Sequence, residues 1–324
     1  FNVNNGSLKN SEAGQINDLF GRQAWVGLSS DQYGSVTLGR QYDLIVDYVA
    51  PQSATGTGWG GNVAAHPFDN DDMDNSMRLN NSIKFSSATF AGIKVGAMYA
   101  FSNAAGASGN DNAYSVGAHY VYGGLTVAAA YDQINRNNGA PNTAGATSTT
   151  DGNYLSLGGD QQIYSVSAGY QFANKASIGV VWSHSATDNL GNGTGASLFG
   201  NSYALTGSSL KFDNFEINGR YFVRPDFSLG AAYTYTMASF SGGTAGPAGA
   251  TTLVKTRGAT PHWNQITLQA DYLLSRSTEI YATGAYQKVS GGNGIQAFNA
   301  GIYNMTQASG NEQVVAGVGI RHRF

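Results

Sequence analysis

Apolar and polar residues alternate along most of this chain. Between residues 312 and 324 the apolar side chains stand two positions apart, at Val314, Ala316, Val318 and Ile320. A β-strand places successive side chains on opposite faces, so this spacing predicts a strand with one apolar and one polar face. Thirteen segments share the pattern: Phe20–Ser30, Ser35–Tyr42, Ser82–Phe90, Ile93–Ser102, Ala113–Tyr122, Leu125–Ile134, Gln162–Phe172, Ala176–Ser185, Leu210–Arg224, Phe227–Ala238, His262–Ser275, Thr278–Val289 and Glu312–Phe324.

The connections between these segments alternate between short and long. The short ones are residues 31–34, 91–92, 123–124, 173–175, 225–226 and 276–277, and the long ones are residues 43–81, 103–112, 135–161, 186–209, 239–261 and 290–311. Short turns at one end and long loops at the other are typical of outer-membrane barrels. The chain is therefore predicted to be all-β and to form a transmembrane antiparallel β-barrel over residues 1–324.

The composition agrees with a barrel. Only 11% of the 324 residues are charged and none is cysteine, whereas soluble domains carry about 25% charged residues. No apolar run reaches the ~18–20 residues of a membrane helix, which excludes a helical membrane protein. The net charge of -3 gives no reason to expect nucleic acid as a partner. The five histidines have no metal-site spacing, so no metal or cofactor is expected.

Thirteen is an odd number of strands, whereas single-chain bacterial barrels have even counts. If the last strand ends at the periplasmic side, the first predicted strand also runs inward, and residues 1–19 form an extracellular loop. An unpaired strand edge is not tolerated in hydrocarbon. We therefore expect that an odd number of strands precedes this chain in the complete wall.

Several strings resemble one family, the general trimeric porins of Gram-negative outer membranes, most closely the β-proteobacterial branch. They are FGRQAWVGLSS at 20–30, GSVTLGRQYD at 34–43, NNSIKFSSATFAG at 80–92 and GVGIRHRF at the end of the chain. The resemblance implies a 16-stranded barrel, of which three strands precede this chain, and a homotrimer. It also implies contact with the lipid bilayer and lipopolysaccharide, passive diffusion of small hydrophilic solutes and ions, and a C-terminal assembly signal at Phe324.

Charged side chains on the strands are expected to face water. A Lys or Arg on the lipid face near mid-membrane costs roughly 2–4 kcal/mol. Lys84 shares a face with Ser82 and Ser86, so it points inward. The same rule assigns to the wall of the lumen Asp132, Glu216, Arg220, Asp271 and Arg321.

The longest connection, residues 43–81, concentrates acidic residues at Asp43, Asp47, Asp69, Asp71, Asp72 and Asp74. A loop this long inside a compact protein is usually functional or disordered, and the resemblance makes it the constriction loop. A solvated surface loop and a cation site are the alternatives, although the run from Asp69 to Asp74 lacks the glycine and distal glutamate of a calcium loop.

Four basic residues are candidates for the opposite side of the constriction. Arg22 matches an arginine that the family places on the wall facing the loop. Arg78 and Lys84 share the inward face by periodicity. Periodicity alone aims Arg40 outward, so we expect it to bond the base of the loop.

These features favour a water-filled channel in which opposed charges create a transverse field. The alternative is an adhesive or structural barrel whose extracellular loops bind ligands and whose lumen is plugged. The two differ in whether residues 43–81 fold inward. A hydrolase would need a convergent Ser/His or Asp/His group, and no enzymatic activity is expected.

Overall fold

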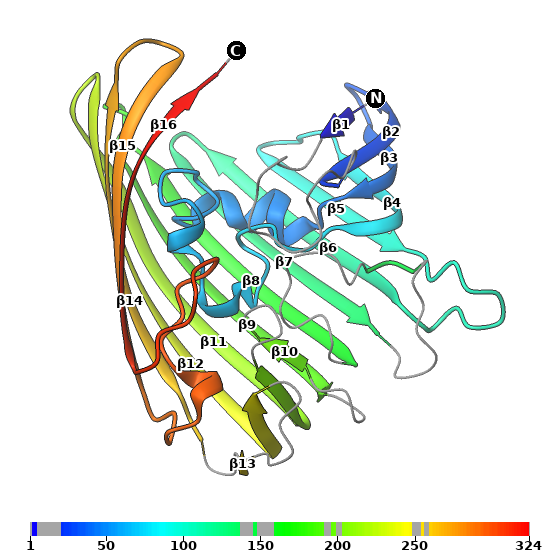
Figure 1. Cartoon of the computed structure of the whole chain (residues 1–324). Coiled ribbons are helices and arrows are strands. Elements are labelled where there is room, and N and C mark those ends of the chain that lie inside the picture. The colour runs from blue at the N-terminus through cyan, green and yellow to red at the C-terminus, as the bar shows by residue number, and fades with distance from the viewer. Residues whose placement is uncertain are drawn as a thin grey trace.

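The computed structural model describes residues 2–4, 21–136, 145–147, 159–190, 196–198, 203–247, 254–255 and 259–323. Its strands form one antiparallel sheet that curves around a hollow (Figure 1). They are β1 (Asn2–Asn4), β2 (Gln23–Ser30), β3 (Gly34–Gln41), β4 (Leu79–Ser87), β5 (Ile93–Ala100), β6 (Asn112–Tyr122), β7 (Leu125–Asn135), β8 (Asp160–Gln171), β9 (Ser177–Leu190), β10 (Ala196–Leu198), β11 (Tyr203–Arg224), β12 (Phe227–Pro247), β13 (Val254–Lys255), β14 (His262–Leu273), β15 (Thr278–Ser290) and β16 (Glu312–His322).

Each of the thirteen predicted segments corresponds to one of these strands, and the predicted all-β architecture is confirmed. Neighbouring strands pair in chain order, while β10 pairs only with β11 and β13 only with β12. The extracellular loop expected over residues 1–19 needs correction, because Asn2–Asn4 pairs with β2 through Asn2 and Trp25. Three residues are too few to reveal an alternating pattern.

The strands β11 and β12 extend further than predicted, to 22 and 21 residues. Their added parts pair through small residues, Gly207 with Gly243 and Ser209 with Ser241. Such residues give no contrast between apolar and polar positions, so periodicity could not show this extension.

The strands β1 and β16 are the two ends of the sheet, and no ladder joins them in the described residues (Figure 1). The expectation of further strands before this chain stays a prediction.

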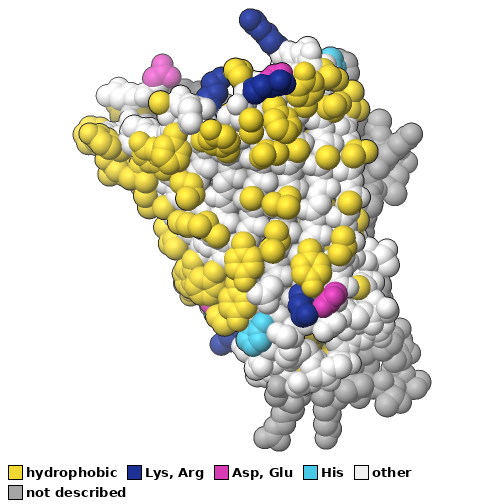
Figure 2. Space-filling view, turned by 90° about the vertical axis from the view of Figure 1, so that its left-hand side faces the viewer, with side chains coloured by type: hydrophobic (Ala, Val, Ile, Leu, Met, Phe, Trp, Pro, Cys, Tyr) yellow, Lys and Arg dark blue, Asp and Glu magenta, His cyan; other side chains and the backbone are white. Residues whose placement is uncertain are grey.

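The sheet is apolar on its outer face and polar on its inner face. In β14, Ile266 and Leu268 are exposed on the outside, at 47% and 55%, whereas the inward Gln265 and Thr267 are buried. Figure 2 shows apolar side chains spread over this outer face and charged side chains near its two ends. A wall with this polarity suits lipid outside and water inside.

No helix of the described residues is long and apolar enough to cross a membrane.

The connection between β3 and β4, residues 42–78, folds into the hollow (Figure 1) and is called the inner loop below. It contains the π-helical turn η1 (Ile45–Val49) and the 3₁₀ turns η2 (Ala50–Gln52), η3 (Asn62–Ala64) and η4 (Pro67–Asp69). In the first part of the loop, Leu44, Ile45 and Val49 are buried in one apolar cluster with residues of β7, β8 and β9. Burying a Leu or Ile side chain contributes roughly 1.5–3 kcal/mol, so this contact holds the loop against the wall.

A second apolar cluster lies toward the long-loop end of the sheet. The ring of Phe68 in the inner loop lies 5.7 Å from those of Phe212 and Trp263, measured between centroids. Trp263 also packs against Phe298 in the 3₁₀ turn η5 (Gln296–Phe298). The inner loop is therefore packed at both ends.

Candidate functional site

Polar side chains of the wall bond the backbone of the inner loop along its length. On β11, Asn218 Nδ2 donates to Gln52 O at 2.8 Å. On β14, Gln265 Nε2 donates to Val63 O at 3.0 Å. On β9, Ser185 Oγ donates to Asn70 O at 2.6 Å. Buried carbonyl groups need such partners, so the inward polar residues of the strands explain how an irregular loop can lie inside the hollow.

The centre of this attachment is His66, which is buried between two carboxylates. Its Nδ1 lies 2.6 Å from Asp71 Oδ2 and its Nε2 lies 3.1 Å from Glu216 Oε2. Glu216 is the wall residue that the alternation aimed inward, and it also accepts a hydrogen bond from Ala54 N at 2.7 Å. Asp71 accepts a hydrogen bond from Ser183 of β9.

The protonation of this group follows from its neighbours. Burial by itself lowers the pKa of His66, but the charge of Asp71 and the hydrogen bonds to both carboxylates outweigh it and raise that pKa to about 10. Burial favours the neutral form of Asp71, but the charge of His66 and several hydrogen bonds outweigh it and lower the pKa of this carboxyl. At neutral pH the imidazolium therefore bridges the inner loop and β11.

The other acids of the 69–74 run bond the loop itself. The carboxylate of Asp69 accepts hydrogen bonds from Asp74 N at 2.9 Å and Ser76 N at 3.2 Å. Asp72 Oδ1 accepts one from Met77 N at 2.7 Å, and Asp74 accepts one from Thr55 Oγ1. All these carboxylates are buried.

Burial raises the pKa of two of these groups. For Asp69, burial and the charge of Asp71 raise the pKa to about 6. For Asp72, burial and the charges of Asp43 and Asp69 raise the pKa well above its usual range. Both carboxyl groups therefore hold their protons to a higher pH than a free aspartic acid does.

Asp43 and Asp132 are also buried. Asp43 Oδ1 accepts hydrogen bonds from Ile45 N at 2.8 Å and Val46 N at 3.0 Å, and so begins the turn η1. Asp132 of β7 interacts electrostatically with Asp43. No group of three or more His, Asp or Glu residues within the described ranges has the geometry of a metal site.

The remaining acid, Asp47, is the one exposed carboxylate of the six. Its Oδ2 lies 2.7 Å from Lys84 Nζ, and the two side chains are 33% and 12% exposed. Lys84 also donates to Tyr42 O at 2.9 Å. Lys94 on β5 interacts with the charge of Asp47, and the sequence reasoning missed it. The alternation that placed Lys84 would have found it, because Lys94 lies opposite the exposed Ile93 and Val95.

The structure places the three candidate arginines around the ends of the inner loop. Arg22 Nη1 donates to Asn75 Oδ1 at 2.9 Å. Arg40 Nη1 donates to Asn80 Oδ1 at 2.6 Å, beside a break in the β3–β4 register that interrupts the alternation. Arg78 is fully buried, with its guanidinium carbon 5.6 Å from the centroid of the Tyr42 ring.

Two further ion pairs lie on the inner wall. Arg220 Nη2 lies 3.3 Å from Asp271 Oδ2, and Arg321 Nη1 lies 2.6 Å from Glu279 Oε1. In each pair the base is the more exposed partner. Arg220 is 26% exposed and Asp271 2%, and Arg321 is 38% exposed and Glu279 6%. Glu279 was missed, although it faces Arg321 across β15 and β16. Phe324, the expected assembly signal, lies outside the described residues.

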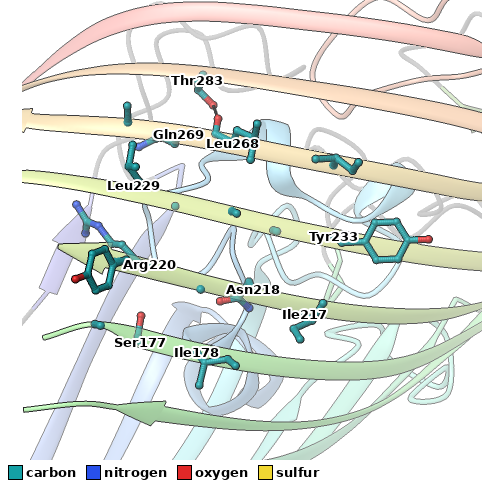
Figure 3. A pocket seen from close by; sticks show the side chains of 18 of the residues that line it. Ser177, Ile178, Ile217, Asn218, Arg220, Leu229, Tyr233, Leu268, Gln269 and Thr283 are labelled. Carbon is teal, nitrogen blue, oxygen red and sulfur yellow. Dashed lines mark hydrogen bonds between the residues drawn. The ribbon is translucent and has the colours of Figure 1, made fainter. Parts of the chain in front are cut away.

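A groove of about 1260 Å³ lies over β9 to β15. Figure 3 shows Ile217, Leu229 and Leu268 lining it. Smaller residues such as Ala231 also belong to the lining. Because its lining is mainly apolar and includes the exposed side chains of the outer face, it is a feature of the lipid side rather than of the solute path.

The sequence profile of the Gram-negative porins matches residues 1–292. The chain belongs to this family. An outer membrane porin protein of Bordetella pertussis is 28% identical to this porin over 331 residues, which cover 97% of the chain and 75% of the relative. The porin is therefore located in the outer membrane of a Gram-negative bacterium.

Solved structures agree on the fold. The anion-selective porin from Comamonas acidovorans has a TM-score of 0.61 at 17% identity, over 94% of this chain and 79% of that one. OmpF of Salmonella typhi, solved with daunomycin, has a TM-score of 0.54 at 17% identity, over 95% of this chain and 79% of that one. Family and fold together establish a water-filled channel for passive diffusion of small hydrophilic solutes and ions.

Proposed function

We propose that this porin prefers small anions and that the inner loop, which corresponds to the constriction loop predicted at residues 43–81, narrows its channel. The observation that carries the preference is the exposure within the wall ion pairs. Arg220 and Arg321 present their guanidinium groups to water, while Asp271 and Glu279 are buried behind them. Charged groups that line a pore set its ion preference, and here the exposed charge is positive.

The narrow part of the channel lies, in this proposal, where Asp47 of the inner loop faces the basic wall. Lys84 and Lys94 lie on β4 and β5 beside it, and Arg22 bonds the loop at Asn75. Low-dielectric walls strengthen the field between opposed charges. Polar solutes align with this field, and apolar solutes are slowed. The fold is compatible with anion preference, since the Comamonas porin named above is anion-selective.

Three observations support a non-enzymatic channel over the alternatives. The inner loop lies within the hollow, whereas an adhesive barrel would display it outside (Figure 1). Both ring nitrogens of His66 bind carboxylates and the ring is fully buried, so it has no route to a substrate. His184 pairs with Asp213 at 2.9 Å and lies opposite the outward Tyr164 of β8, so this pair faces away from the lumen.

The remaining partners follow from family membership and surface chemistry. We propose a homotrimer of single-domain barrels over residues 1–324 that contacts lipid and lipopolysaccharide. Nucleic acid is not a partner in this proposal, because the net charge is -3.

The test is a single-channel recording in a planar bilayer under a potassium chloride gradient. Stepped currents are expected, with a reversal potential closer to the equilibrium potential of chloride than to that of potassium. The double variant with Arg220→Gln and Arg321→Gln is expected to move the reversal potential toward the equilibrium potential of potassium. A wild-type reversal potential closer to the equilibrium potential of potassium would contradict the anion preference. The absence of stepped currents would contradict the channel itself.

A further inference from the structure

A polar pocket of about 510 Å³ lies between the inner loop and the short-turn ends of β7, β8, β9 and β11. The wall contributes Gln171 and Arg220, and the inner loop contributes Gln52 and Trp59. Short turns of an outer-membrane barrel face the periplasm, so the pocket lies on the periplasmic side. It shares no lining residue with the group of charges around Asp47.

The loop side of this pocket is fixed before any solute arrives. Gln52 O accepts the hydrogen bond from Asn218. Trp59 is buried with its ring against Gly230, where an added Cβ would lie 2.4 Å from a ring carbon. A solute can therefore bind to this pocket without the entropic cost of ordering the loop.

The charge of the pocket is positive. Arg220 is partly neutralised by Asp271 and donates from Nε to Ser228 Oγ at 3.0 Å. Lys175 lies exposed in the β8–β9 turn, and its ammonium group forms no hydrogen bond or ion pair with the residues that the structure describes. The pocket therefore offers about one uncompensated positive charge, which suits one carboxylate better than a doubly charged phosphate.

The rest of the lining suits hydroxyl groups. Gln52 and Gln171 carry amides, and Thr126 and Ser177 carry hydroxyls, and both kinds of group donate and accept hydrogen bonds. The ring of Phe222 lies under the guanidinium of Arg220 at 5.0 Å and adds an apolar surface for C–H groups. Small-molecule pockets usually measure about 300–1,000 Å³, so a compound of monosaccharide size fits.

We infer that this pocket is a binding subsite for monoanionic sugar acids, compounds with one carboxylate and several hydroxyl groups. The carboxylate lies between Lys175 and Arg220, and the hydroxyl groups reach the amides of Gln52 and Gln171. The inference rests on the proposed channel, since the solute reaches the pocket through water in the lumen.

The test is a single-channel recording in equal potassium chloride with sodium gluconate added on one side at a time. Gluconate on the periplasmic side is expected to cause brief, concentration-dependent interruptions of the current. Glucose has the hydroxyl groups without the charge and acetate has the charge without the hydroxyl groups, so each is expected to interrupt it far less. Lys175→Gln is expected to weaken the gluconate effect about tenfold.

Arg276→Gln is the matched control, because Arg276 is an exposed base at another short turn and does not line the pocket. It is expected to leave the gluconate effect unchanged. Absence of gluconate interruptions, equal interruptions by glucose, or a full effect in Lys175→Gln would overturn the subsite. Normal conductance and reversal potential in potassium chloride alone separate that outcome from a failure of the proposed channel.

Discussion

Two groups of acidic residues in the same loop have different surroundings. Asp69, Asp71, Asp72 and Asp74, called the anchor acids here, are buried and bond His66, backbone N–H groups and hydroxyls. Asp47 is a third exposed and faces Lys84. The comparison teaches that acids concentrated in a loop need not line the channel. In this porin the anchor acids bond the loop and the wall, and we propose that Asp47 presents its charge to solutes.

Replacing His66 is expected to have the largest effect on this attachment. His66→Gln leaves Asp71 and Glu216 buried without the cation between them, and loss of one partner of a buried ion pair costs about 3–5 kcal/mol. The folded channel is expected to unfold at a lower temperature and to show more current fluctuations. Thermal unfolding followed by circular dichroism measures the first effect. The exposed His322→Gln serves as the control, and equal melting temperatures would show that His66 is no anchor.

Alkaline pH is expected to weaken the same attachment. The pKa of His66 rises from 6.5 to about 10 in the folded protein, so its contribution to stability is complete below pH 6.5 and is lost as pH rises through about 10. A neutral imidazole cannot donate to both carboxylates. Current fluctuations of the wild type should therefore increase from pH 7 to 10, and those of His66→Gln should change little. A wild-type trace that is equally quiet throughout this range would contradict the bridge.

A methyl group at Gly179 is expected to push the loop from the wall. An added Cβ would lie 2.4 Å from Gln52 O, a backbone atom that moves only with the loop. Overpacking of this kind costs typically 1–3 kcal/mol. At Gly284 of β15 the nearest atom would be 3.6 Å away, so Gly284→Ala is the control. Gly179→Ala should lower the melting temperature more than Gly284→Ala does. A larger decrease for Gly284→Ala would contradict the close contact between the inner loop and the wall at Gly179.

Loss of one wall hydroxyl is expected to have the smallest effect. Ser185→Ala removes the hydrogen bond to Asn70 O, but Gln161 Nε2 still donates to that oxygen at 3.2 Å. The expected loss is about 1 kcal/mol or less, measured by denaturant unfolding. A loss as large as that of His66→Gln would mean that the attachment depends on the hydroxyls instead.

Much of the wall could be predicted because lipid and water impose a period of two on each strand. This rule gave the inward side of Glu216, Asp271 and Arg321, and it would also have given Lys94. It aimed Arg40 outward, but a register break beside this residue interrupts the period, and Arg40 bonds Asn80 and Gly21.

The inner loop could not be predicted in the same way, because irregular backbone has no period. Burial of the anchor acids depends on contacts with strands far away in sequence, as between His66 and Glu216, which are 150 residues apart. A lone histidine gives no indication of two such partners. The roles of the loop and of the charges beside it stay predictions.

The most direct test compares Asp47→Asn and Asp72→Asn by reversal potential in one salt gradient. Asp47→Asn removes an exposed negative charge and is expected to shift the potential further toward the chloride side. Asp72→Asn replaces a buried carboxyl with an amide of the same shape and is expected to leave the potential unchanged. A shift in Asp72→Asn as large as that in Asp47→Asn would contradict the division between anchor acids and channel-facing charge.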